Sequence, residues 1–283
     1  MFGKDTLSNK SILVTGGSSG LGFSMAKRFA ELGAKVAICG RNPEKLEKAA
    51  SELSETKANI LTHQVDVRDY EAVGIMIERL VEEFGELNGL VNNAAGNFLC
   101  ATEDLSPNGF KSVVDIVLHG TFNCTHHFGK YLIDSGNTGN ILNIITTYAE
   151  SGCAFVMPSA CAKAGVLAMS KSLAFEWATY GIRVNAIAPG PFPTKGAWTR
   201  LVPDPEFERK FMRRIPAGRF GEHIELANLA VFLMSDLSPY VTGECVTIDG
   251  GERLQAGQFN YIAELAPRQE VREFLKKMRP AKE

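Results

Sequence analysis

No stretch of the 283-residue sequence approaches about 18 uncharged apolar residues, which excludes a transmembrane helix. The chain also lacks a charge excess, because 30 Lys and Arg residues stand against 32 Asp and Glu residues, for a net charge of −2. This balance argues against a nucleic-acid partner, which would require a basic face. No internal repeat and no Pro-, Ser- or Gly-rich linker divides the sequence, so we expect a single domain over residues 1–283.

The six cysteines include no Cys-x-x-Cys pair, and no histidine stands at metal-ligand spacing. Neither a metal site nor a disulfide framework is therefore expected, and the cysteines are predicted to be reduced, buried thiols. The first ten residues are polar and show no signal peptide, and the last three are not a peroxisomal address. We expect a cytoplasmic protein, or one of the mitochondrial matrix if a transit peptide has been removed.

Short apolar runs rich in Val and Ile alternate with longer segments of helical period. The runs lack the in–out alternation of a sheet with one wet face, so they predict parallel strands that are covered on both sides. The predicted strands are Ser11–Val14, Lys35–Cys39, Ile60–Val65, Leu87–Val91, Asn140–Ile145, Arg183–Ala188 and Cys245–Ile248. The helical segments include Gly20–Leu32, Tyr70–Phe84, Phe110–Ser135, Ser159–Thr179 and Glu222–Ser235. This order predicts an α/β fold, a doubly wound Rossmann-like domain with a seven-stranded parallel sheet and helices on both faces.

Two segments interrupt the alternation. Residues 190–220 begin with several prolines and continue into a predicted helix, Glu206–Arg214. Because ligands of such sheets bind beyond the carboxyl ends of the strands, we expect a substrate loop and helix there. The tail, about 268–279, carries apolar residues at helical spacing, with Lys and Arg on the opposite face. It predicts a surface helix that packs on its own subunit or on a neighbour.

A glycine-rich turn, Thr15-Gly-Gly-Ser-Ser-Gly-Leu-Gly22, connects the first predicted strand to the first helix. Its glycines allow a tight turn and a close approach of backbone N–H groups to a pyrophosphate, and the helix N-terminus adds partial positive charge. The alternative is a turn that is merely tight. We predict that the turn binds a dinucleotide through Gly16, Ser18, Ser19, Gly20 and Leu21.

The ends of the next strands indicate which dinucleotide binds. A ribose 2′-hydroxyl calls for a carboxylate after the second strand, whereas a 2′-phosphate calls for a cation. No acid follows that strand, and Arg41 offers a planar guanidinium, so NADP(H) is predicted over NAD. The alternative is that Arg41 is a solvated loop charge. Asp66 and Val67 fit an adenine edge, while Asn93 and Ala94 lie where the cofactor would cross the sheet.

The segments TGGSSGLG, NNAAG and Pro189-Gly190, in this order, resemble the short-chain dehydrogenase/reductase superfamily over residues 8–252. That superfamily usually carries Tyr-x-x-x-Lys at the start of the long helix after the fifth strand. Here Lys163 is present, but Ser159 stands in place of the tyrosine. The asparagine usual in the preceding helix is replaced by Val117. The usual alcohol–ketone mechanism, in which that tyrosine protonates an alkoxide, therefore does not carry over directly.

A narrower group of the superfamily, the 2,4-dienoyl-CoA reductases, shares these departures. The segments TYAE, PS, KAG, GNF and GPFPTKGA are similar to that group. The resemblance implies that the active tyrosine comes from the loop before the helix, here Tyr148, with Asn97 and Ser159 beside it and Lys163 on the nicotinamide ribose. It further implies cofactor contacts at Pro189, Gly190 and Thr194, and acyl-CoA contacts at Phe98, Ser106 and Arg200. It also implies a homotetramer built on paired long helices, Phe110–Ser135 and Ser159–Thr179.

The chemistry of a conjugated dienoyl thioester explains these residue types. Hydride delivered to the δ carbon spreads negative charge to the thioester oxygen, so hydrogen-bond donors such as Tyr148 and Asn97 are needed there. Ser159 would orient the water that protonates the α carbon and gives the 3-enoyl product. Lys163, on the same helix face as Ser159, is expected to lower the pKa of Tyr148.

Each of these residues also has a purely structural interpretation. Tyr148 could cap the sheet, Ser159 could be the N-cap of its helix, and Asn97 could serve its own turn. Lys163 could be a surface charge, and the basic residues from Arg200 onward could be a solvated face rather than a site for CoA phosphates.

The leading hypothesis is an NADPH-dependent 2,4-dienoyl-CoA reductase that yields 3-enoyl-CoA, auxiliary to unsaturated fatty-acid oxidation. A second hypothesis keeps the cofactor and changes the substrate to a 2-enoyl thioester or a carbonyl compound. A third is a non-catalytic NADP-binding sensor, which the missing helix tyrosine suggests. The retained lysine and the surrounding hydrogen-bond donors argue against the sensor.

Overall fold

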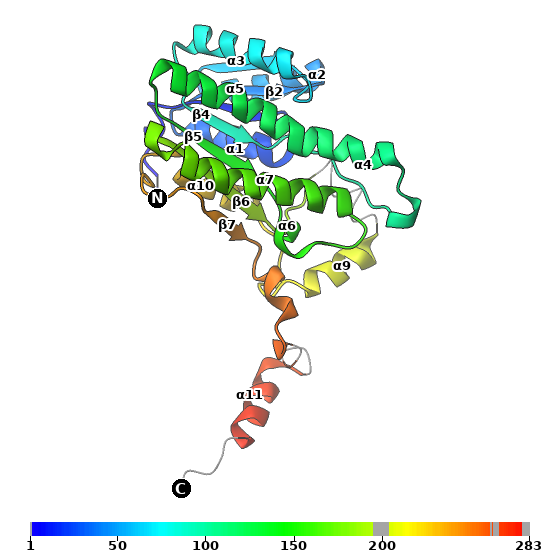
Figure 1. The fold of residues 1–283 in the computed structure, drawn as a ribbon. Helices are drawn as coiled ribbons and strands as arrows, with labels where there is room; N and C mark the ends of the chain where they lie inside the picture. Colours follow the sequence, from blue (N-terminus) through cyan, green and yellow to red (C-terminus); the bar gives the residue numbers. More distant parts are fainter. Residues whose placement is uncertain (1, 195–203, 261, 263–265, 279–283) are drawn as a thin grey trace.

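The computed structural model describes residues 2–194, 204–260, 262 and 266–278, and places seven parallel strands in one sheet of order β3-β2-β1-β4-β5-β6-β7 (Figure 1). The strands are β1 (Ser11–Thr15), β2 (Lys35–Gly40), β3 (Ile60–Gln64), β4 (Gly89–Asn92), β5 (Gly139–Ile144), β6 (Ile182–Pro189) and β7 (Cys245–Ile248). The predicted α/β fold with a seven-stranded parallel sheet is confirmed. The strand order reverses between β1 and β4, which creates the crevice where ligands of doubly wound sheets bind.

Helices cover both faces of this sheet because alternate strand residues point to opposite sides. Ile12 and Val14 pack in one core cluster with α1, α2 and α10, whereas Leu13, between them, packs in another with α3 and α5. The helices are α1 (Gly20–Glu31), α2 (Pro43–Ser54), α3 (Tyr70–Phe84), α4 (Pro107–Val114), α5 (Gly120–Ser135), α6 (Tyr148–Ser151), α7 (Met157–Glu176), α9 (Pro205–Arg213), α10 (His223–Met234) and α11 (Arg268–Lys277). The short helical turns are η1 (Thr102–Asp104), η2 (Asp115–His119), η3 (Ala178–Tyr180) and η4 (Glu252–Ala256).

The long helix predicted over Phe110–Ser135 differs from the observed one in two ways. It begins at Pro107, where the side chain of Ser106 accepts a hydrogen bond from the Gly109 N–H and caps α4. It also contains a π-helical turn, η2, between α4 and α5. Val113 and Val117 are buried on either side of the start of this turn.

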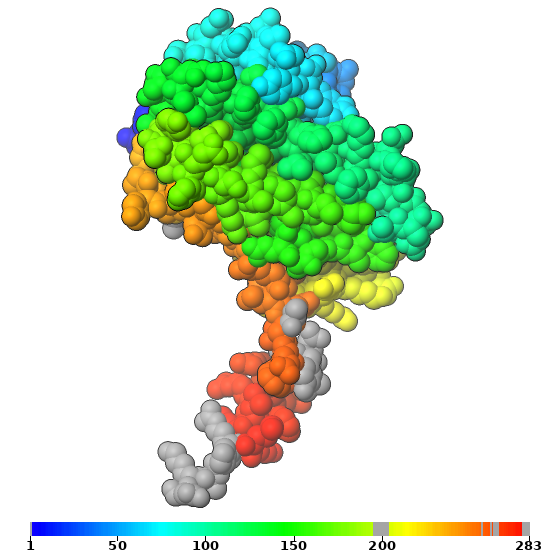
Figure 2. Space-filling view, in the orientation of Figure 1, coloured from blue at the N-terminus to red at the C-terminus, as the bar shows by residue number. Residues whose placement is uncertain are grey.

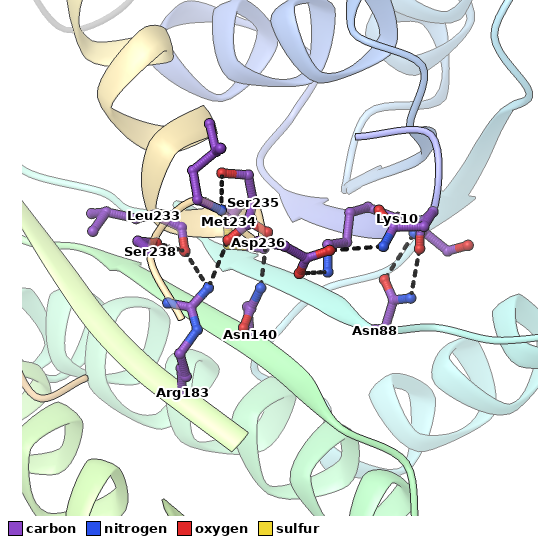
Figure 3. Close-up of polar contacts among 12 residues, drawn as sticks. Lys10, Asn88, Asn140, Arg183, Leu233, Met234, Ser235, Asp236 and Ser238 are labelled. Carbon is purple, nitrogen blue, oxygen red and sulfur yellow. Dashed lines mark hydrogen bonds and ion pairs between the residues drawn. The ribbon is translucent and has the colours of Figure 1, made fainter. Parts of the chain in front are cut away.

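Polar contacts hold the end of α10 against the sheet at the edge shown in Figure 3. The guanidinium of Arg183 donates to the carbonyl oxygens of Leu233 and Ser235 at 2.9 and 3.1 Å, and Asn140 donates to the Met234 carbonyl at 2.8 Å. These bonds satisfy carbonyls that the helix leaves unpaired at its C-terminus. The polar side chains at the amino ends of the strands therefore stabilise the fold, whereas the carboxyl ends of the strands are left to form a functional site.

The helix predicted at about 268–279 is present as α11, which stands away from the sheet (Figures 1 and 2). Its Val271 is buried within the chain, and packing on a neighbouring subunit stays a prediction. All six cysteines are free thiols, but only Cys39 and Cys124 are buried, whereas Cys100 and Cys245 are half-buried and Cys153 and Cys161 are exposed, so the expectation of burial was wrong for these four. Among the described residues, no helix combines the length and apolarity that a membrane span requires, and no group of side chains could hold a metal ion.

Candidate active site

The glycine-rich turn between β1 and α1 is shaped by contacts that only glycine permits. Gly16 and Gly20 have φ values of +64° and +57°, in the left-handed region. A Cβ on Gly22 would lie 2.6 Å from the Gly16 carbonyl oxygen. The N-cap of α1, Ser19, makes no side-chain capping bond, and the first turn holds no acidic residue. The N–H groups and partial positive charge of this helix end therefore fit an anionic group such as a pyrophosphate.

Three other segments of the chain lie around this turn. The Thr15 hydroxyl accepts hydrogen bonds from the N–H groups of Asn93 and Ala94 at 2.9 and 3.0 Å, which fixes the end of β4 beside the turn. The Thr194 methyl group lies 3.4 Å from where a Cβ of Gly20 would be. Ser18 lies 3.8 Å from the corresponding point of Gly40, at the end of β2. The structure thus brings the predicted residues Asn93, Ala94 and Thr194 beside the turn, and the turn's Ser18 beside the end of β2.

Asp66, which follows β3 and was predicted to bind the adenine edge, already has a partner in the structure. Its carboxylate forms an ion pair with the Arg68 guanidinium at 2.6 Å, and this hydrogen bond holds the pKa of Asp66 below its usual value. The charge of Arg41 acts in the same direction. Sequence reasoning did not include Arg68, although its position beside Asp66 was a signal. An adenine amine would have to share the Asp66 carboxylate with Arg68.

Tyr148, Asn97 and Ser159 form one hydrogen-bonded group at the carboxyl ends of β4 and β5. The Tyr148 and Ser159 hydroxyls are hydrogen-bonded at 3.2 Å, and the Asn97 amide donates to the Tyr148 hydroxyl at 3.4 Å. The Asn97 side-chain oxygen accepts from the Phe98 N–H at 2.9 Å, which orients its amide nitrogen toward the phenol. Ser159 lies inside α7, whose N-cap is Val156, so the N-cap interpretation of Ser159 was wrong.

Burial raises the pKa of Tyr148, and hydrogen bonds from Ser159 and Asn97 only partly offset this effect. The Thr146 hydroxyl acts in the same direction as these bonds; its oxygen is buried and has no regular hydrogen-bond partner among the residues that the structure describes. The expectation that Lys163 would set a lowered pKa for Tyr148 was therefore wrong, because loss of hydration outweighs the polar contacts. A phenol that stays protonated is a hydrogen-bond donor. The sequence analysis did not include Thr146 among the site residues, although its position two residues before Tyr148 could have suggested it.

Lys163 is a buried cation, with 6% of its surface exposed. Its ammonium donates to the Ile144 carbonyl oxygen at the end of β5, and burial lowers its pKa to about 8. The interpretation as a surface charge was wrong. No carboxylate among the described residues pairs with it, and a buried, unpaired ammonium is costly to fold, so it indicates a functional role.

A buried polar network holds α7 in register with the sheet. The Asn92 amide donates to Asn143 at 2.8 Å and to Thr125 at 2.9 Å, and the Asn143 amide donates to Ser170 at 2.8 Å. These bonds join β4, β5, α5 and α7. Because Ser159 and Lys163 lie on α7, the network fixes both against the end of β5.

The three residues predicted to contact acyl-CoA do not form a single group in the structure. Phe98 packs partly buried against the core cluster beneath α7, and Ser106 caps α4, a structural role that the sequence did not indicate. Arg200 lies outside the described residues. Pro189 ends β6 and Gly190 follows it, where a Cβ on Gly190 would lie 2.6 Å from the Asp249 Cβ. The roles of these residues toward a substrate or cofactor stay predictions.

This fold, with its glycine-rich turn and its lysine on α7, defines a nucleotide-dependent oxidoreductase class. A family model described as enoyl-(acyl carrier protein) reductase matches residues 16–252. The chain belongs to this family of short-chain dehydrogenases/reductases. It is 49% identical to a short chain dehydrogenase from Bacillus anthracis, whose crystal structure matches with a TM-score of 0.80 over 87% of this chain and 97% of that one.

Relatives with more specific names are also similar to this chain. It is 45% identical over 254 residues to a probable 2,4-dienoyl-CoA reductase [(2E)-enoyl-CoA-producing] of Bacillus subtilis, covering 89% of this chain and 100% of that protein. It is 45% identical over 251 residues to a probable 2,4-dienoyl-CoA reductase 3 [(3E)-enoyl-CoA-producing] of Caenorhabditis elegans, covering 87% and 81%. A gluconate 5-dehydrogenase from Burkholderia cenocepacia, solved with NADP and tartrate, is 31% identical, with a TM-score of 0.82 over 88% and 97%.

Proposed function

We propose that this protein is an NADPH-dependent 2,4-dienoyl-CoA reductase that yields 3-enoyl-CoA. The observation that carries the proposal is the Tyr148 phenol, supplied from outside the usual helix position and hydrogen-bonded to both Asn97 and Ser159. The names of the relatives support the same substrate class. NADPH, when bound, supplies a hydride for the δ carbon of the diene.

The side chains of the site then stabilise the charge that reaches the thioester oxygen. Tyr148 is held protonated by burial and donates its O–H to this oxygen, while Asn97 keeps a second amide hydrogen for the same atom. Both donors are positioned before the charge develops, in a partly buried site, which makes their hydrogen bonds effective. Lys163 would bind the hydroxyls of the nicotinamide ribose.

The position of protonation decides which product forms. The extended enolate can accept a proton at the α carbon, which leaves a 3-enoyl product, or at the γ carbon, which leaves a 2-enoyl product. We assign α protonation to a water oriented by Ser159, because a serine hydroxyl is itself a poor acid. The relatives' names differ on this point, with (2E) for the Bacillus protein and (3E) for the Caenorhabditis protein. Turnover in D₂O, followed by NMR of the product, is expected to place deuterium on the α carbon.

The activity is tested by following NADPH absorbance with a 2,4-dienoyl-CoA, a 2-enoyl-CoA and a 3-oxoacyl-CoA. The dienoyl ester is expected to be consumed fastest. Turnover of one of the other esters alone would favour a reductase of a different substrate. Tight NADPH binding without turnover of any thioester would favour a sensor.

Arg41 is expected to determine the preference for NADPH over NADH. Arg41→Ala removes the guanidinium that would bind the 2′-phosphate, so kcat/KM for NADPH is expected to fall about 10- to 100-fold, the range of a charge-assisted hydrogen bond. The value for NADH is expected to stay within about twofold, because NADH lacks that phosphate. Lys48→Ala, which removes an exposed charge from α2, is the control. Equal losses with both cofactors would contradict this role.

We further propose a homotetramer that assembles through the outer faces of α5 and α7. Exposed Phe122 and Phe175 on these helices support this assembly, because large apolar side chains left in water favour association. Light scattering is expected to give four chains per particle. In a cell the enzyme would act beside the oxidation of unsaturated fatty acids, in the cytoplasm or in an organelle; several relatives are named as peroxisomal.

A further inference from the structure

The segment between α6 and α7 holds a bulky side chain in a backbone conformation that such residues avoid. Phe155 has a φ of +64°, and 59% of its surface is exposed. A bulky residue in the left-handed region is strained and persists only where the surrounding structure holds it. Strain of this kind clusters at ligand sites. The conformation of Phe155 therefore requires an explanation beyond the need to connect α6 to α7.

A backbone hydrogen bond fastens this strained segment to the loop that follows β4. The Cys100 N–H donates to the Phe155 carbonyl oxygen at 2.9 Å. Leu99, directly before Cys100, is 50% exposed, whereas its neighbour Phe98 packs inward. Two large apolar side chains, Leu99 and Phe155, are therefore held in contact with water by two segments that are joined to each other.

The same two segments carry the catalytic candidates. Asn97 lies on the loop of Leu99, Tyr148 begins the helix just before Phe155, and their side chains are hydrogen-bonded at 3.4 Å. The segments thus meet twice, once through the polar pair and once through the bond to Cys100. A dienoyl thioester whose oxygen lies at the polar pair must direct the rest of its acyl chain along the surrounding surface.

We propose that Leu99 and Phe155 form an apolar rim that binds the hydrocarbon tail of the dienoyl-CoA beyond its δ carbon, so that longer acyl chains are preferred. This inference rests on the proposed function. Single exposed apolar residues are common on protein surfaces. This pair differs because its two segments also carry the hydrogen-bonded Asn97 and Tyr148, and because one member, Phe155, has a strained backbone. Each methylene that leaves water at the rim strengthens binding, which a short chain cannot gain.

The test compares kcat/KM for ten-carbon and six-carbon 2,4-dienoyl-CoA esters with NADPH. The wild-type protein is expected to prefer the ten-carbon ester. Phe155→Ala and Leu99→Ala are each expected to lower the ten-carbon value about tenfold, the effect of roughly two methylenes, and the six-carbon value less than about threefold. Ile75→Ala is the matched control, because Ile75 is 51% exposed on α3 and is expected to keep the wild-type ratio.

Phe155→Gly separates the ring from the backbone strain. Glycine adopts positive φ freely, so this variant is expected to unfold at or above the wild-type temperature and yet to lose the chain-length preference. An unchanged ratio in both Phe155 variants, or equal losses on both esters, would overturn the rim. A change of oligomeric state in the variants would also overturn it, since the pair would then be a subunit contact. If the wild-type protein reduces neither ester, the proposed function fails instead.

Discussion

Replacement of Tyr148 by phenylalanine is expected to lower kcat for the dienoyl-CoA on the order of 100- to 1,000-fold, while the affinity for NADPH stays unchanged. The variant keeps the ring and its packing and removes only the hydroxyl that is hydrogen-bonded to Ser159 and Asn97. The loss should appear in kcat rather than in KM, because this hydrogen bond strengthens as charge reaches the thioester oxygen. Stopped-flow measurement of NADPH oxidation would isolate the hydride-transfer step.

Three further variants test whether the hydroxyl acts as proposed. Tyr180→Phe removes a hydroxyl from a half-exposed tyrosine in η3 and is expected to keep full activity. Asn97→Ala is expected to lower kcat on a similar scale. The Tyr148→Phe/Asn97→Ala double variant should lose less than the product of the single losses, because both donors serve one oxygen. Full activity in Tyr148→Phe would show that another group stabilises the charge.

The sheet could be predicted from sequence because each strand is a short apolar run bounded by polar residues. The strand Cys245–Ile248 has the same limits in the sequence analysis and in the structure, while the fourth strand was predicted to begin at Leu87 and begins at Gly89. The difference has a local cause: the side chain of Asn88 accepts from the Ser11 N–H and donates to the Asn9 carbonyl. Side-chain bonds to the backbone of this kind are not visible in hydrophobic periodicity.

The site could be predicted only as a set of residue types at the ends of strands. The resemblance indicated that Tyr148, Asn97 and Ser159 act together, and the structure places them in hydrogen-bonding contact. The sequence did not give the balance between burial and polar contacts that sets the pKa of Tyr148, since this balance depends on the packing around the phenol. The strained conformation of Phe155 was equally inaccessible, because positive φ is expected of glycine and asparagine rather than of phenylalanine.

Lys163→Met is expected to remove most of the activity and at the same time to make the protein more stable at neutral pH. In the folded protein burial lowers the pKa of Lys163 from 10.5 to about 8, so at pH 7 the folded state buries a charge that the unfolded state leaves in water. This shift corresponds to a cost of about 3 kcal/mol. Loss of the bond to the Ile144 carbonyl offsets about 1 kcal/mol of the gain. The remaining 2 kcal/mol or so predicts a rise in Tm of about 5 °C.

The pH dependence gives this prediction a definite sign. Between pH 8 and pH 10.5 the unfolded chain binds more protons at Lys163 than the folded chain does, so wild-type stability gains a contribution that increases with pH across this window. Lys163→Met should lack that increase, whereas Lys171→Met, which removes an exposed lysine from the same helix, should retain it.

Catalysis should show the opposite trend: kcat/KM for NADPH should fall above about pH 8 as the Lys163 ammonium loses its proton. The phenol of Tyr148 cannot cause that fall, because burial raises its pKa rather than lowering it. Thermal unfolding of the wild-type protein and both variants at several pH values, with the alkaline limb of the rate profile, would measure both effects. A lowered Tm of Lys163→Met at pH 7 would contradict the idea that this lysine is kept for function at the expense of stability.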